Sequence, residues 1–312
     1  MFYNIKYKNK LKVKSNYILF KYNKLNIFNI MSLDIHTKIN KKSNEQLYEI
    51  VNRWKKLYIS MKHNYLLTVC IIIQIVGFSI LYPSNPKRGI ISNLIFGLIS
   101  FIISIFSGYY VHVYSHLYDY EKLYKTLWSS SNFIGCLLRK LPIKIQYILN
   151  KFVYLLDFHD KIHHDTSVNK KWYNLLIEFC MNIYTEGVAL IILFKLFDFG
   201  IHIRGSIFKI NYPILFAWSI LYATIHNINY NIVTPICHIQ HHINEKTNYG
   251  IDFMDILMGS KYDDVPEKMN HASINIIVIM LFIIYIKEFY KPDPNNIVTS
   301  YIYNYINWLI SY

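Results

Sequence analysis

Two long apolar runs, separated by a short turn, restrict this chain to few folds. The first run covers residues 65–82, the second covers residues 89–110, and neither contains a charged residue. The hydrocarbon core of a bilayer is about 30 Å thick, which roughly 20 helical residues can cross. The sequence between the runs, PSNPKRG, has the proline and glycine residues of a tight turn. The pattern therefore predicts a transmembrane helical hairpin.

A second pair of apolar runs is less regular. Residues 175–199 include Glu178 and Glu186, and residues 212–226 are few for a full crossing. A second hairpin that is tilted, or partly enclosed by protein, is the simplest interpretation. Residues 274–287 are a further short apolar run, which fits either an interfacial helix or a fifth membrane span.

The positive charge of the chain is concentrated near its N-terminus. The formal net charge is +14, and residues 1–64 hold 14 lysine and arginine residues against three acidic ones. A basic flank beside a membrane span explains this more simply than nucleic-acid binding does. The hydrophobic content of 53% also favours a membrane protein. Within this region, residues 43–63 have apolar side chains at helical spacing and predict an amphipathic helix on the membrane surface.

These features predict three regions. Residues 1–42 form a basic N-terminal arm that we expect to be disordered, residues 43–290 form the membrane domain, and residues 291–312 form a C-terminal tail. Met31 offers an alternative start of the chain. The four cysteine residues lie far apart without CxxC spacing, which indicates neither a disulfide framework nor a zinc ribbon.

Histidine spacing carries the functional information. Histidines three or four residues apart lie on one face of a helix, so a group of them can direct several imidazoles at one metal ion. Neutral imidazole binds iron, zinc, copper and nickel. A single HxxxH pair arises easily by chance, whereas two three-histidine boxes in one chain do not. The candidate ligands are His112, His116, His159, His163, His164, His226, His238, His241 and His242.

The predicted spans place these histidines on one side of the membrane. If the basic N-terminus is cytosolic, the first hairpin returns the chain to the cytosol at His112 and the second returns it at His226. The histidines between and after the hairpins then lie on the same side. Nine imidazoles exceed what one ion can bind, so we expect two like metal ions within about 6 Å of each other.

The last histidine group belongs to a longer pattern, HIQHHINEKTNYGIDFMDILMGS, at residues 238–260. With the HxxxH at His112 and the box HDKIHH at His159, it resembles the fatty acid hydroxylase/sterol desaturase superfamily of membrane di-iron enzymes. The resemblance covers residues 65–260. The chain departs from the family pattern in two places: the middle box is HxxxHH where the family has HxxHH, and HNINYN around His226 is a loose match.

The resemblance and the predicted spans together imply an all-α integral membrane protein. Two transmembrane helical hairpins would carry a cytosolic helical cap that holds a histidine-rich di-metal site. The implied activity is that of an O2-dependent, non-haem di-iron hydroxylase or desaturase acting on a fatty acyl, sphingolipid or sterol substrate. The implied cofactor is two iron ions, which zinc can replace in a purified form. The implied location is the endoplasmic reticulum membrane, with the site facing the cytosol.

Polar residues near the boxes are candidates for orienting the imidazoles. A carboxylate or amide beside a ligand histidine can accept the N–H of the second ring nitrogen. The candidates are Asp160, Asp165, Asn248, Asp252 and Asp255. The resemblance also implies a cytochrome b5-type electron donor, and lysines beside the boxes would attract such an acidic partner. These lysines are Lys170, Lys171, Lys246 and Lys261.

Other protein classes fit the pattern less well. A ferritin-like bundle needs Glu-x-x-His pairs, a metalloprotease needs HExxH where this chain has HDKIH, and a bis-histidine haem protein needs only two histidines. A non-enzymatic membrane protein that binds or transports metal ions remains an alternative. A catalytically inactive member of the family is another.

Overall fold

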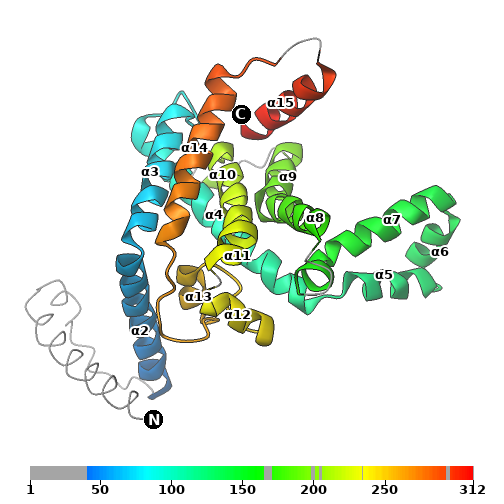
Figure 1. Cartoon of the computed structure of the whole chain (residues 1–312), viewed down its shortest axis with the longest axis horizontal. Coiled ribbons are helices and arrows are strands. Elements are labelled where there is room, and N and C mark those ends of the chain that lie inside the picture. Colours follow the sequence, from blue (N-terminus) through cyan, green and yellow to red (C-terminus); the bar gives the residue numbers. More distant parts are fainter. Residues whose placement is uncertain are drawn as a thin grey trace, which may run out of the picture. The chain divides into compact units, whose positions relative to one another are not determined.

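The computed structural model describes residues 41–164, 171–197, 201–203, 206–233, 235–292 and 296–311. These residues are almost entirely helical (Figure 1). The chain divides into one unit that ends at Glu49 and a second unit that covers residues 50–312, and the features below belong to the second. The predicted N-terminal arm lies outside the described residues, apart from its last two positions.

The first half of the chain contains α2 (Lys41–His63), α3 (Tyr65–Leu81), α4 (Ile90–Leu117), α5 (Tyr120–Ser129), α6 (Phe133–Lys140), α7 (Ile143–Leu156) and the π-helix η2 (His159–His163). It is followed by α8 (Trp172–Ile183), the π-helix η3 (Tyr184–Val188), α9 (Ala189–Phe197) and an antiparallel pair of strands, β1 (Ile201–Ile203) and β2 (Ser206–Phe208). Next come α10 (Tyr212–Thr224), the π-helix η4 (Ile225–Asn229), α11 (Tyr230–Val233), α12 (Ile236–Ile243) and α13 (Asp252–Met258). The chain ends with the 3-10 helix η5 (Asn270–Ala272), α14 (Ser273–Ile284), the π-helix η6 (Tyr285–Phe289) and α15 (Ile297–Ile310).

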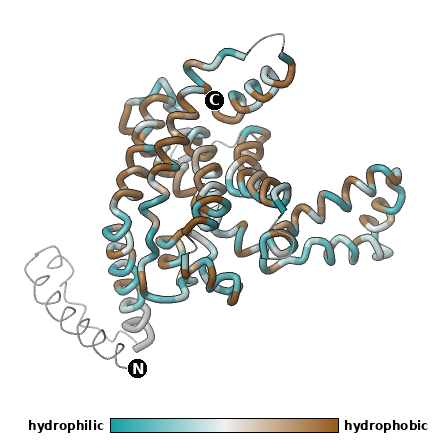
Figure 2. The backbone as a smooth tube through the Cα atoms, viewed as in Figure 1, coloured by the Kyte–Doolittle hydropathy of each residue, from teal (hydrophilic) through white to brown (hydrophobic). Residues whose placement is uncertain are grey.

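Three helical stretches of the described residues are long and apolar enough to cross a membrane. They are Ile90–Leu117, Trp172–Phe197 and Asn270–Phe289. A fourth is present if α3 is counted together with the end of α2, from which it is bent by 90°. Figure 2 shows their apolar residues in brown. The prediction of a helical chain with several helices suited to a membrane is confirmed, and the run at residues 274–287 belongs to one of them.

Helix α10 is the centre of the bundle. It packs against α3, α4, α8 and α14, and nine of its 13 residues are buried. A helix that is apolar on all sides is stable where neighbouring helices cover every side. Of the two interpretations of the short run at residues 212–226, a tilted span or a run partly enclosed by protein, the structure shows the enclosed one.

The segment predicted as a C-terminal tail contains a packed helix. Helix α15 lies against α10 and η6, and Leu309 and Ile310 at its end are buried. The region between His116 and His159 forms a separate feature, in which α5 packs against α6 and α7. We call residues 120–156 the α5–α7 projection, because these helices extend away from the bundle (Figure 1).

Candidate metal centre

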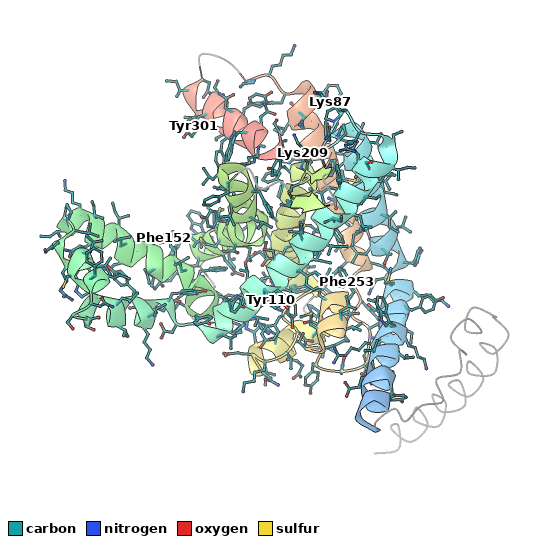
Figure 3. All side chains as sticks on the ribbon, turned by 180° about the vertical axis from the view of Figure 1, so that it is seen from behind. Lys87, Tyr110, Phe152, Lys209, Phe253 and Tyr301 are labelled. Atoms are coloured by element: carbon teal, nitrogen blue, oxygen red, sulfur yellow. The ribbon has the colours of Figure 1, made fainter. Side chains whose placement is uncertain are left out.

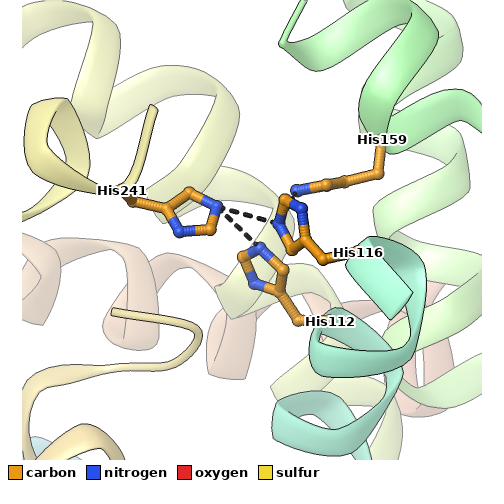
Figure 4. A group of neighbouring side chains, drawn as sticks. All are labelled: His112, His116, His159 and His241. Carbon is orange, nitrogen blue, oxygen red and sulfur yellow. Dashed lines mark hydrogen bonds between the residues drawn. The ribbon is translucent and has the colours of Figure 1, made fainter. Parts of the chain in front are cut away.

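The first group of histidines lies where α4 meets α12. His112 and His116 are one helical turn apart on α4, and the centroids of their rings are 5.3 Å apart. The Nε2 atom of each lies 3.1 Å from Nε2 of His241, which α12 supplies from the opposite side (Figure 4). His159 completes the group, with its Nε2 atom 2.9 Å from that of His116. The ligand atoms of these four residues all lie within 4.8 Å of one another.

The second group joins η2, α8, η4 and α12. His163 Nε2 lies 3.0 Å from Nε2 of His226, and His238 Nε2 lies 3.1 Å from Nε2 of His242. His163, His238 and His242 can provide ligand atoms within 4.8 Å of one another, and so can His163, Glu178 and His226. The second group therefore contains four imidazoles and one carboxylate.

His164 lies between the two groups. Its Nε2 atom is 3.1 Å from Nε2 of His159 in the first group, and its ring centroid is 4.5 Å from that of His242 in the second. The structure thus brings together all nine histidines that the sequence suggested as metal ligands, from four separate parts of the chain.

A π-helix explains the unusual spacing of the middle box. The amide of His164 donates to the carbonyl of His159, five residues earlier, as in a π-helix and not an α-helix. The wider turn holds one more residue. The rings of His159, His163 and His164 consequently stay within 4.8–5.3 Å of one another. The π-turn therefore keeps all three rings of the HxxxHH box close enough to face one site.

Hydrogen bonds at the second ring nitrogen orient several imidazoles. His241 Nδ1 lies 2.7 Å from the carbonyl oxygen of Thr247. A carbonyl only accepts, so Nδ1 carries the proton and Nε2 of the neutral ring keeps its lone pair. His163 Nδ1 donates to Glu178 Oε1 at 2.8 Å, with the same consequence. His112 Nδ1 lies 3.1 Å from the hydroxyl of Tyr222.

The surroundings keep these imidazoles uncharged. Burial, reinforced by neighbouring imidazoles, lowers the pKa of His164 to about 2 and that of His238 to about 3. Burial likewise lowers the pKa of His241 to about 4. Imidazoles with such values are neutral at pH 7, which is the state that binds metal ions.

The nitrogen positions fit bound metal ions better than a network of hydrogen bonds. An imidazole nitrogen has either one N–H or one in-plane lone pair, so it cannot make two good hydrogen bonds. The Nε2 atoms of His116, His159 and His241 each have two other Nε2 atoms within 3.1 Å. A cation among the lone pairs would satisfy all of them at once. Imidazole-rich sites with a carboxylate suit iron, zinc, copper or nickel.

Among the described residues, no hydrogen bond joins Asp252 to an imidazole. Its carboxylate accepts hydrogen bonds from Ser60 on α2 and from Lys261. This pairing also buries Lys261, whose side chain is 8% exposed. Lys261 was expected on a surface that attracts an electron donor, and this expectation is wrong because Asp252 binds its ammonium group inside the protein.

Two other predicted residues act through the turn after α12. Asp255 accepts from Ser260 Oγ at 2.7 Å and from the amide of Gly250 at 3.1 Å. Asn248 adopts a φ of 54°, a left-handed conformation that asparagine tolerates, and its side chain donates to the carbonyl of Cys237 at 2.9 Å. These contacts hold the turn whose Thr247 carbonyl orients His241. The side chain of Asp160 and the whole of Asp165 lie outside the described residues.

Sequence reasoning missed three groups that orient ligands: the carboxylate of Glu178, the hydroxyl of Tyr222 and the carbonyl of Thr247. A signal existed for Glu178 alone. An ionisable residue in an otherwise apolar run usually has a functional partner. Tyr222 could not be singled out among 29 tyrosines, and a backbone carbonyl leaves no trace in the sequence.

A cavity adjoins both histidine groups. It is small, with a volume of about 20 Å³, and is lined by His112 of the first group and by His226 and His238 of the second. Glu267 also lines it, and among the described residues Oε1 of this buried side chain has no hydrogen-bond partner. Burial, with a smaller contribution from the charge of Asp252, raises the pKa of Glu267 to about 8. A neutral carboxylic acid therefore faces the space beside the histidines at pH 7.

Comparisons with protein-family models, with curated proteins and with solved structures find no match for this chain. The functional argument therefore rests on the geometry of the two histidine groups.

Proposed function

We propose that this chain is a di-iron oxidoreductase that uses O2 to hydroxylate or desaturate a fatty acyl, sphingolipid or sterol substrate in the membrane. One observation carries the proposal: two adjacent groups of buried or half-buried, neutral imidazoles lie beside helices apolar enough to cross a membrane. A site of this kind can hold two ions that are open to O2 and close to a lipid. The sequence resemblance to the fatty acid hydroxylase/sterol desaturase superfamily supports the same reaction.

The number of histidines supports iron over zinc. Two zinc ions in tetrahedral geometry would bind eight ligands. The two groups and His164 provide nine imidazoles, and iron accepts six ligands per ion.

The protein residues bind and shield, while bound iron would supply the activation of O2. Hydroxylation of a C–H bond consumes O2, two electrons and two protons and forms a C–OH group and water. Desaturation consumes the same reagents and forms a C=C bond and two waters. The low pKa values of His164, His238 and His241 keep their lone pairs available for the ions throughout the neutral pH range. Burial excludes bulk water from the reacting carbon.

The electrons must come from another protein. We propose a cytochrome b5-type donor that approaches the exposed Lys171 and Lys246, near the second histidine group. The remaining parts of the proposal are residence in the endoplasmic reticulum and a site on the cytosolic face. The basic N-terminus supports the cytosolic side, and the sequence resemblance supports the endoplasmic reticulum.

The test is to measure metal content and lipid products together. Purified protein should contain two metal ions per chain. It should be active when these ions are iron. The double variant His163→Ala/His242→Ala should lose at least one ion and all new lipid products of a heterologous host, yet still insert into the membrane. His63→Ala is the matched control, because His63 is exposed and lies outside both groups. Unchanged products in the double variant would exclude the enzyme. Retained metal binding without any lipid product in the parent would favour a metal-binding protein.

A further inference from the structure

The α5–α7 projection exposes large apolar side chains. Phe133 is 81% exposed on α6, and on α7 Ile143 is 83%, Tyr147 62% and Ile148 63% exposed. None of the residues of α5 or α7 is buried. Phe152, labelled in Figure 3, is exposed in the same helix. So much apolar surface on one element marks a surface that is covered in the working protein.

Most of the charged residues on the projection are positive. Residues 120–156 contain six basic residues and a single acidic one, Glu121, at the base. Lys144 and Lys151 lie between the exposed apolar residues of α7 and are exposed themselves. Lysine stems can lie along an apolar surface while their ammonium groups reach a polar layer. This combination of apolar and basic residues is typical of helices that bind anionic lipid surfaces.

The tip of the projection has a defined structure. A Cβ atom at Gly135 would lie 2.3 Å from the carbonyl oxygen of Ser130 and 2.5 Å from that of Leu127, so only glycine lets α6 pack on the end of α5. Arg139 then donates to the carbonyls of Trp128 and Ser130. The contacts of Gly135 and Arg139 fix the position of α6. They therefore hold Phe133 in an exposed position.

The base of the projection adjoins a row of exposed tyrosines at the end of α4. Tyr110, Tyr114 and Tyr118 are exposed at this end of α4, and adjacent rings lie 5.8–6.3 Å apart. The series continues to Tyr120, the first residue of α5. Exposed tyrosines concentrate at the headgroup level of a bilayer. A membrane crossed by Ile90–Leu117 would therefore have its headgroup layer at the base of the projection.

We propose that the α5–α7 projection docks on the headgroup layer of a membrane that contains anionic lipids. Its apolar side chains would enter the interface, and its lysine and arginine residues would bind lipid phosphate and carboxylate groups. A bilayer is the favoured occupant because the same chain has helices suited to crossing it and because the projection starts at the tyrosine level. This surface is additional to the proposed oxidoreductase and does not depend on it.

Docking would also act on the metal centre. Asp157, at the end of α7, accepts hydrogen bonds of 2.8 Å from the amides of Tyr120 and Glu121, which closes the base of the projection. His116 precedes this base and His159 follows it. The position of the projection on the membrane would thus fix the first histidine group relative to the lipid surface.

The experiment uses the exposed Cys136 on α6 as a label site in the full chain, with Cys180 replaced by serine. The protein is placed in nanodiscs of phosphatidylcholine alone or with phosphatidylserine, and carries an environment-sensitive fluorophore. We expect a blue shift and quenching by headgroup spin-labelled lipid in the anionic discs, both weakened by high salt. Lys140→Glu/Lys144→Glu should reduce the docked fraction roughly tenfold. Ile143→Ser/Ile148→Ser should also undock the label, and Lys246→Glu, outside the projection, should not.

The contrary outcomes are distinct. A label that stays in water in both kinds of disc would overturn the proposal. So would a label that is shielded only when a soluble protein is added, since that would identify a protein partner as the occupant. Equal quenching in neutral and anionic discs would overturn the requirement for anionic lipid. The readout is the surroundings of the label and not lipid oxidation, so loss of the proposed enzyme activity cannot imitate any of these results.

Discussion

At the scale of single residues, the second nitrogen of an imidazole decides where the first one points. Glu178 binds Nδ1 of His163 and Thr247 binds Nδ1 of His241, and both rings then present a lone pair to the site. Only one of these partners is a side chain that mutation can remove. Glu178 is therefore the residue at which the orienting effect can be measured.

Replacing Glu178 by alanine should weaken metal binding by about 10–100-fold, because His163 would lose the acceptor that fixes its tautomer and orientation. Glu178→Gln is the matched variant. It keeps an oxygen acceptor at the same distance and should retain most of the affinity. Competition with a chromophoric chelator measures the constants. Equal affinities for the alanine and parent proteins would show that His163 needs no such partner.

Glu267 should make stability depend on pH. Its pKa is raised from 4.5 to about 8, so the folded protein holds a proton that the unfolded chain has lost between these values. The stabilising contribution is complete below pH 4.5 and is lost as the pH rises through 8. The thermal midpoint of the parent should therefore fall, relative to that of Glu267→Gln, by at least a few degrees between pH 5 and pH 9. Parallel curves for the two proteins would show that Glu267 ionises normally.

At the scale of secondary-structure elements, close contacts between helices hold the ligands in place. Gly187 in η3 lies against α10, and a Cβ atom there would lie 2.8 Å from the carbonyl oxygen of Leu215 and 2.8 Å from Cβ of Ser219. Backbone atoms cannot move aside as a flexible side chain can. Since α8 precedes η3 and carries Glu178, the approach of these helices also sets the position of that carboxylate.

Gly187→Ala should lower the thermal midpoint, because α10 and η3 would have to separate, at a loss of about 1–3 kcal/mol. Gly89→Ser is the matched control. A Cβ atom at position 89 meets nothing within 4 Å, and the residue is the N-cap of α4 in an extended conformation, where serine is favourable. Thermal unfolding of the purified proteins in detergent makes the comparison. If the thermal midpoints of Gly187→Ala and Gly89→Ser both equalled that of the parent, the contact between η3 and α10 would tolerate a methyl group.

At the scale of the second unit, the histidines gather toward one end of the long helices. Lys87, in the turn before α4, and Lys209, before α10, lie together at one end in Figure 3, and Tyr110 is labelled nearer the other. His112 and His116 follow Tyr110 on α4, so the metal centre lies away from the two lysines. A membrane crossed by Ile90–Leu117 would separate the two ends.

Cysteine accessibility tests this arrangement. In a protein with Cys136 and Cys180 replaced by serine, Lys122→Cys and Lys246→Cys should react with an impermeant reagent from the same side of sealed vesicles. Lys87→Cys should react only from the opposite side, because α4 lies between it and Lys122. Labelling of Lys122→Cys and Lys246→Cys from different sides would separate the first histidine group from α12 and contradict a shared site.

Local composition and spacing along one helix were enough to predict the helical class, the apolar stretches suited to a membrane and the nine histidines. The shortness of residues 212–226 left two interpretations open, a tilted hairpin or a run partly enclosed by protein, and the burial of α10 on all sides shows the second. The C-terminal segment gave no sign in the sequence that it packs on α10.

The division of the histidines into two groups, and the groups that orient them, depend on the tertiary structure. The split into two groups depends on where α12 meets α4 and η2, which no spacing encodes. The π-turn that accommodates HxxxHH needs its surroundings to stabilise it. Asp252 and Lys261 were assigned to the site and its surface by nearness in sequence, yet they pair with each other. A buried charge binds the nearest opposite charge in space, and that neighbour is set by the fold.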